Sequence, residues 1–228
     1  MLKALDVKKH RRIWSETAGR SNMGKSKKQE KTVKITSPGK ESSPVKEVIE
    51  WNRYFTSCSA ADWNRLPEIE LYMDQVVTFL DRQMTMYRKN EDEKVVTRSM
   101  INNYTKDRVI PRAEAKKYSK EHIALITVVC SLKKVLSIPD LSNLLKDFNV
   151  NQGNEVEKYY ELFCDYQKQS IERTSRIISE SLKEHESGKS SDGNEEKILL
   201  KSLALKLAVE AQTQSAAAEQ ILSILEKF

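Results

Sequence analysis

The sequence predicts an all-α protein, and three observations lead to this prediction. Glycine and proline are scarce, with six and five in 228 residues, and these two residues are the strongest local breaks in regular structure. Apolar residues recur at intervals of three and four in several segments, which is the helical period. No apolar run approaches the ~18 residues that a membrane-spanning helix needs. Charged residues are frequent instead, with 39 Lys and Arg and 33 Asp and Glu. The combination indicates a charged, mainly helical, soluble chain.

Residues 1–44 are expected to form a disordered basic arm. Residues 1–46 contain 13 Lys and Arg against four acids, and aliphatic residues are sparse after Trp14. Such a segment buries too little apolar surface to offset the entropy lost on ordering. Two interpretations remain open, a basic arm that contacts DNA phosphates and a solvated tail. The first 14 residues lack the apolar core of a signal peptide.

A helical domain is predicted for residues 45–150, beginning with two amphipathic helices. Residues 45–55 show helical spacing, and residues 68–86 form a longer helix with Pro67 in its first turn. Residues 85–94 are polar and are predicted to form a loop. The positions expected to be buried on the longer helix form one stripe: Ile69, Met73, Val76, Val77, Leu80 and Met84.

Residues 94–134 predict a helix-turn-helix with a wing. Thr97 is an N-cap for a short helix over residues 98–106, which must end before Pro111 because proline disfavours helical geometry in the preceding residue. A basic loop follows at residues 112–117, and Ser119 then caps a longer apolar helix. A small polar-faced helix, a turn, a basic loop and a buried helix are typical of a DNA-binding module.

The distribution of charge supports the same interpretation. Residues 94–134 hold ten Lys and Arg against three acids, whereas residues 47–93 hold five against ten and residues 135–228 hold eleven against sixteen. A basic patch confined to one segment is the electrostatic footprint of a nucleic-acid binder. The alternative is an ordinary helical hairpin whose basic surface is only solvated.

Specific residues are assigned to the two parts of DNA recognition. Asparagine matches the paired donor and acceptor of adenine and arginine matches guanine, whereas lysines and arginines of the loop suit phosphates. His122 near the helix start is either structural or a phosphate contact. The predicted base readers are Arg98, Ser99, Asn102 and Asn103, and the predicted phosphate contacts are Lys106, Arg108, Arg112, Lys116, Lys117 and His122.

Three sequence blocks carry a resemblance to known families. IELYMDQV, MINNY and KKYSKEHIA resemble blocks of an uncharacterised bacterial domain-of-unknown-function family, and the stretch from TRSMINNY to SIPDLSNLL resembles the winged helix of mercury-resistance (MerR-type) regulators. The resemblance implies a MerR-like DNA-binding fold and a transcriptional regulator that binds double-stranded DNA. MerR-type wings usually carry Gly-Tyr-Arg, and residues 112–117 lack glycine, which allows for a bare loop in place of the wing.

The C-terminal region, residues 154–228, is predicted to contain a helical pair. A short helix at residues 140–147 precedes a break near Gly153, and helices follow at residues 155–184 and 197–228. The last helix has a 4-3 apolar seam interrupted by Gln214, which predicts a homodimer; packing back on the preceding helix as an antiparallel hairpin is the alternative. The predicted dimer contacts are Leu207, Ile221 and Leu225.

No catalytic group, metal site or cofactor is expected. The three cysteines have no CxxC spacing and the three histidines are isolated from one another, which indicates a reducing cytoplasm without a zinc site. No nucleophile with an orienting base is present, so the chain is not expected to be an enzyme. A protein-interaction adaptor, using the aromatic helix with Tyr159, Tyr160, Phe163 and Tyr166, is the alternative to a regulator. The effector is unknown.

Overall fold

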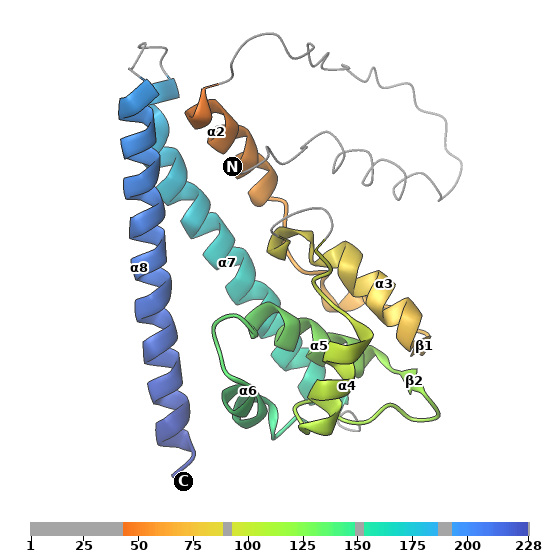
Figure 1. Ribbon diagram of the computed structural model, residues 1–228. Helices are drawn as coiled ribbons and strands as arrows, with labels where there is room; N and C mark the ends of the chain where they lie inside the picture. Colours follow the sequence, from red (N-terminus) through yellow and green to blue (C-terminus); the bar gives the residue numbers. More distant parts are fainter. Residues whose placement is uncertain (1–42, 89–92, 149–152, 187–192, 228) are drawn as a thin grey trace, which may run out of the picture.

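The computed structural model describes residues 43–88, 93–148, 153–186 and 193–227, and these residues are almost entirely helical (Figure 1). Most of the predicted arm, residues 1–42, lies outside the described residues. Two turns of 3-10 helix, η1 (Trp63–Arg65) and η2 (Thr85–Tyr87), and two short strands, β1 (Leu71–Tyr72) and β2 (Lys117–Tyr118), interrupt the helices. The α-helices are α2 (Pro44–Phe55), α3 (Met73–Gln83), α4 (Arg98–Lys106), α5 (Lys120–Leu132), α6 (Ile138–Leu145), α7 (Gly153–Glu186) and α8 (Gly193–Leu225). The prediction of a mainly helical chain is confirmed.

Helix α5 is the centre of the fold because it is buried on all sides. Every residue from His122 to Ser131 is buried, and a helix of this kind needs a partner on each face. Residues of α3, α4, α5, α6 and the first half of α7 form one buried cluster, which runs from Ala61 to Tyr160. We call this cluster the central core. The sequence predicts a domain boundary at residues 150–154. Val156 and Tyr160 of α7 follow that boundary but pack in the central core with the residues before it.

A second, smaller cluster lies where α2 meets the C-terminal half of α7 and the N-terminal half of α8. It consists of Val45, Ile178, Leu182 and Leu203, and we call it the outer cluster. The α2–α7 contact also has a polar part: the Nδ2 atom of Asn52 donates to the Ser175 carbonyl at 3.1 Å and to the Ser179 hydroxyl at 3.0 Å.

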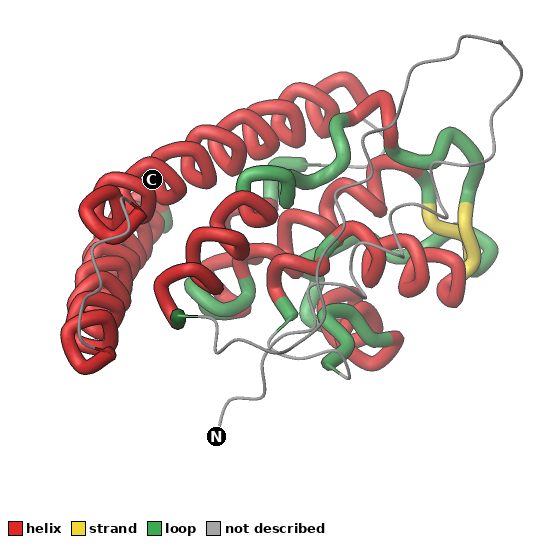
Figure 2. The backbone as a smooth tube through the Cα atoms, turned by 90° about the horizontal axis from the view of Figure 1, so that it is seen from above, coloured by secondary structure: helices red, strands yellow, loops and turns green. Residues whose placement is uncertain are grey.

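Helix α8 runs antiparallel to α7 and lies on the opposite side of the molecule from the two strands (Figures 1 and 2). Its first part packs in the outer cluster. Nearer its C-terminal end, the Nδ2 atom of Asn143 in α6 donates to the Leu222 carbonyl at 3.1 Å, and the Ser215 hydroxyl donates to the Val135 carbonyl at 2.7 Å. Helix α8 is therefore fastened at two places along its length.

The packing of α8 changes the interpretation of its seam. Leu207 is partly buried against the outer cluster within the chain, so this part of α8 packs as the hairpin alternative describes, while the assignment of Leu207 to a dimer interface stays a prediction. Ile221 and Leu225 stay 60% and 55% exposed. These two remain candidates for self-association.

The helix predicted for residues 68–86 begins later than expected. Leu71 and Tyr72 pair as a strand with Tyr118 and Lys117, and Ile69, predicted to be buried, is 71% exposed. The backbone N–H of Tyr72 donates to the Gln75 side chain at 2.9 Å, which caps α3 at Met73. The pairing partner lies far away in sequence, so a local helical period cannot reveal it.

Candidate nucleic-acid interface

Helix α4 has one buried face and one exposed polar face, as its sequence predicts. Thr97 is the N-cap, and its hydroxyl accepts from the Met100 N–H at 3.2 Å. Ile101 and Tyr104 are 0% and 5% exposed and fix the helix on the central core. The exposed face presents Arg98, Ser99, Asn102, Asn103 and Lys106.

The end of α4 is fixed by a left-handed residue and two buried ones. Arg108 has φ 59°, and the next N–H, that of Val109, donates back to the Tyr104 carbonyl at 2.9 Å. Val109 and Ile110 are then 3% and 1% exposed. The chain leaving α4 is thus held on the core while the Arg108 side chain faces solvent.

The basic loop ends in a tight turn rather than an open loop. Ala115 and Lys116 both have positive φ, 46° and 66°, and the Lys117 N–H donates to the Glu114 carbonyl at 2.8 Å. Two central residues with positive φ are the pattern of a type I′ hairpin turn. The predicted loop is therefore a tight turn followed by β2, and β2 pairs with β1 from before α3. Lys116 lies at the exposed tip of this turn.

Backbone strain gathers in this same segment. Within the described part of the chain, the non-glycine residues with positive φ are Arg108, Ala115 and Lys116. A left-handed conformation costs roughly 1–2 kcal/mol for a residue with a Cβ, and glycine would avoid that cost. Strain of this kind is concentrated at functional sites in proteins. In this chain the left-handed residues stand at the end of α4, at Arg108, and in the tight turn, at Ala115 and Lys116.

His122 supports the loop from inside. Its Nδ1 accepts from the Ser119 N–H at 3.2 Å, so the ring proton lies on Nε2, which faces the Arg112 carbonyl at 3.2 Å. The side chain is 3% exposed, and burial lowers the pKa of the imidazole. Of the two predicted roles, the structure supports the structural one. The assignment of His122 to phosphate contact is corrected because both ring nitrogens are used internally.

The other predicted contact residues lie on the surface. Arg98, Ser99, Asn102 and Asn103 are exposed on α4, and Lys106, Arg108, Arg112 and Lys116 are exposed at its end and along the loop. Lys117 is only partly exposed, with its Nζ 3.7 Å from a Glu70 carboxylate oxygen and 6.0 Å from the centre of the Tyr72 ring. The exposed candidates all lie between residues 98 and 116, in α4 and the chain that follows it.

The comparison with known families matches the region built around α5. Residues 61–163 match a family described as Domain of unknown function (DUF1836). This match covers less than half of the chain. The matched residues nearly coincide with the central core, which begins at Ala61 and ends at Tyr160. No curated protein and no solved structure matches the chain.

The matched region also contains ion pairs that sequence reasoning missed. Asp74 pairs with Arg98, Glu70 with Lys117 and Glu68 with Lys120. The acids come from residues 68–74 and the bases from α4, β2 and α5. Glu68 and Glu70 precede α3 and Asp74 lies in its first turn, and the sequence gives no spacing signal that relates these acids to the basic segment.

The described residues contain no group of three or more His, Cys, Asp or Glu side chains arranged to hold a metal ion. In the same part of the chain, no helix combines the length and the apolar character needed to cross a membrane. The cysteine thiols are not activated: burial raises the pKa of Cys58, of Cys164 to about 11, and of Cys130 to about 12.

Proposed function

We propose that this protein is a sequence-specific, double-stranded-DNA-binding transcriptional regulator of MerR-like helix-turn-helix type that acts as a homodimer. The observation that carries the proposal is the exposed polar face of α4, which is followed along the chain by the exposed cations Arg108, Arg112 and Lys116. Ile101 and Tyr104 hold the opposite face on the central core, so the polar face can enter a groove without unfolding the domain.

In this proposal, different residues contact the bases and the phosphates, according to where they lie in the fold. Arg98, Ser99, Asn102 and Asn103 project from one helix and read base edges in the major groove. Lys106, Arg108, Arg112 and Lys116 lie where α4 ends and along the turn, and they contact phosphates and set orientation. The buried core beneath α4 makes the reading helix rigid, and rigid placement is what base discrimination requires.

The adaptor alternative loses its main surface. Of the four aromatic residues that defined it, Tyr160 is 1% exposed, and Tyr159 packs on Phe148 with ring centres 4.0 Å apart. Phe163 packs on the central core. Only Tyr166 of the four is strongly exposed, at 62%, which leaves too little aromatic surface for a protein-docking site on this helix.

The test of DNA binding is the salt dependence of affinity for a short random-sequence duplex. A regulator that contacts phosphates shows a steep fall of log K with log salt, whereas an adaptor shows little binding at any salt. Asn102→Ala is expected to cost ~1–3 kcal/mol on the preferred site and to relax discrimination there. Lys116→Ala serves as its matched control and is expected to weaken all sequences equally and to lower the salt slope by about 1. If Asn102→Ala leaves the ratio of preferred to random binding unchanged, α4 is not the reader.

Dimer formation is proposed through the end of α8, where Ile221 and Leu225 are exposed. Two copies joined there would present two α4 helices to DNA about one turn apart or on a bent site. Replacing both residues with Asp is expected to give monomers, because charges would enter an apolar contact. Molar mass from light scattering decides this part of the proposal, and a monomeric wild type would contradict it.

A further inference from the structure

The cations of the proposed interface fall into two kinds. Lys106, Arg108, Arg112 and Lys116 form no ion pair with any other residue that the structure describes. Arg98 differs, because its Nη2 pairs with the Oδ1 atom of Asp74 while both side chains remain about two-thirds exposed, at 66% and 65%. Arg98, at the start of α4, is therefore an exposed cation with an exposed carboxylate beside it.

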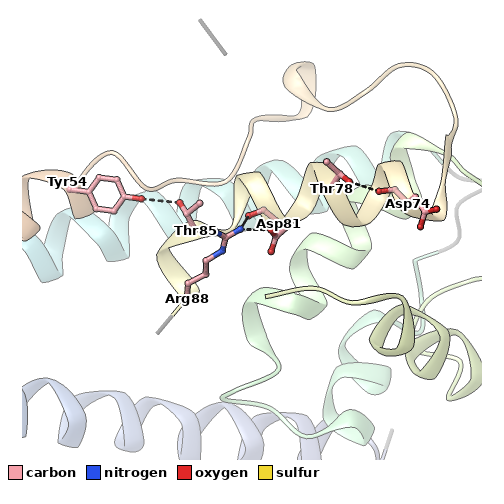
Figure 3. Close-up of polar contacts among 6 residues, drawn as sticks. All are labelled: Tyr54, Asp74, Thr78, Asp81, Thr85 and Arg88. Carbon is pink, nitrogen blue, oxygen red and sulfur yellow. Dashed lines mark hydrogen bonds and ion pairs between the residues drawn. The ribbon is translucent and has the colours of Figure 1, made fainter. Parts of the chain in front are cut away.

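Asp74 is held on a rigid support. It lies in the first turn of α3, and the Thr78 hydroxyl donates to its backbone carbonyl at 2.7 Å. The other end of α3 is clamped by Arg88, whose guanidinium contacts the Asp81 carboxylate and donates to its carbonyl at 2.9 Å. Figure 3 shows this clamp and Asp74 at opposite ends of the helix, with the Asp74 carboxylate directed away from Thr78.

The two neighbouring ion pairs are of a different nature. Lys120, the partner of Glu68, has a side chain only 11% exposed, and its Nζ lies 4.8 Å from the centre of the Trp63 ring. Glu70, the residue before β1, pairs with Lys117 of β2 at 3.7 Å, and their side chains are 53% and 41% exposed. These pairs fasten the segment of residues 68–72 to the fold, whereas the Asp74–Arg98 pair lies in the open beside α4.

We propose that Asp74 determines DNA specificity by making Arg98 a reader of base edges and by penalising phosphate at the same place. The inference rests on the DNA binding proposed above. Any group that Arg98 contacts lies close to the Asp74 carboxylate, well within the ~10 Å over which charges interact at 0.1 M salt. A phosphate there is repelled, but the guanine acceptors O6 and N7 carry no net charge. Arginine has five N–H donors, so contact with Asp74 leaves others free for a base.

The experiment compares wild type with Asp74→Asn on a random-sequence duplex and on a duplex selected from a randomised pool. The variant is expected to bind the random duplex about 2- to 5-fold more tightly, because the Arg98 charge becomes available to phosphates. Its salt slope on that duplex is expected to steepen by up to ~0.9, the amount for one added phosphate contact. Affinity for the selected duplex rises less, so the ratio of selected to random binding falls.

Two controls isolate the ion pair. Glu180→Gln makes the same change in net charge at an exposed position of α7, between Ile178 and Leu182 of the outer cluster, and should leave the ratio unchanged. In an Arg98→Ala background, Asp74→Asn should no longer change the ratio, because the pair is already broken.

The outcomes separate this inference from the proposed function. A lower ratio in Asp74→Asn that disappears in the Arg98→Ala background supports the inference. If Asp74→Asn strengthens both duplexes by the same factor, as a simple change in net charge would, the inference is overturned and DNA binding stands. If the wild type binds no duplex, or binds all duplexes equally, the proposed function and the inference both fail.

Discussion

The central core and the outer cluster are built from the same kinds of side chain but differ in how completely they enclose them. Helix α5 is buried from His122 to Ser131, whereas α8 has Leu203 and Leu222 as its buried residues. Burial of apolar area provides most of the stability of a packed element. We therefore expect the domain that carries α4 to be rigid. Helix α8, which buries few residues and contacts the rest of the molecule at two places, should be less firmly held.

The largest expected effect comes from a cavity in the central core. Ile126 is 0% exposed on α5, and Ile126→Ala removes three carbons from a site enclosed by helices on every side. The expected loss of unfolding free energy is about 4 kcal/mol, near the upper part of the range for such truncations. Denaturant unfolding followed by circular dichroism measures it. A loss below about 1 kcal/mol would show that the core around α5 can collapse, and the contrast with α8 would fail.

Truncation in the outer cluster should have a smaller and local effect. Leu203 is 7% exposed and packs with Val45, Ile178 and Leu182. Leu203→Ala is expected to cost about 2 kcal/mol, at the low end of the range because solvent and neighbours can fill the space. Hydrogen exchange should become faster in α8 while that of α5 is unchanged, since weakly packed elements open on their own. Equal acceleration in both helices would mean that α8 and the central core unfold as one unit.

The two regions should also differ in their response to pH through His122. Burial lowers the pKa of this imidazole below its usual 6.5, so the unfolded chain binds the proton more readily than the folded one. The contribution of neutral His122 to the free energy of unfolding is fully present above about pH 6.5. It falls as the pH drops toward the pKa of His122 in the folded state, by at most about 1.4 kcal/mol per pH unit. His122→Gln should abolish this part of the pH dependence, because glutamine can still cap Ser119 but does not titrate.

Unfolding free energies of wild type and His122→Gln measured between pH 8 and pH 5, a window that brackets the usual histidine pKa of about 6.5, test this prediction. Parallel curves would mean that His122 does not titrate within the window. Hydrogen exchange at the lower pH should show the loosening first in the loop held by the Arg112 carbonyl, rather than in α8.

The smallest expected effect is that of removing residues 1–42. The outer cluster begins with Val45, which is 2% exposed, and Ser43 donates from its hydroxyl to Glu196 at 2.5 Å. Deletion up to residue 42 keeps both contacts, so the thermal midpoint should stay nearly unchanged. Deletion up to residue 45 is the matched comparison and should lower it by removing a buried valine. A large drop for the shorter deletion would contradict the prediction of a disordered arm.

The same shorter deletion tests the two interpretations of the basic arm. If the arm contacts phosphates, its loss should flatten the salt slope on random duplex. If the arm is only a solvated tail, the slope should not change.

The sequence alone determined the features that depend on near neighbours. The start of α4 follows from a Thr97 hydroxyl that reaches an N–H three residues away. Pro111 shows that the helix must end before Ile110, although the left-handed Arg108 ends it earlier. The apolar period likewise predicted that Ile101 and Tyr104 lie beneath the polar face. Each of these choices is made within one or two helical turns, so local pattern is enough.

Only the tertiary structure decided the contacts between segments far apart in the chain. Leu71 and Tyr72 became a strand because Tyr118 and Lys117 offered backbone partners, and Ile69 stayed exposed for that reason. Leu207 turned inward because α7 and α2 lie beside it, and Asp74 met Arg98 because α3 and α4 share the central core. Such pairings depend on how helices pack, and a periodic pattern in one segment does not specify the segment that lies against it.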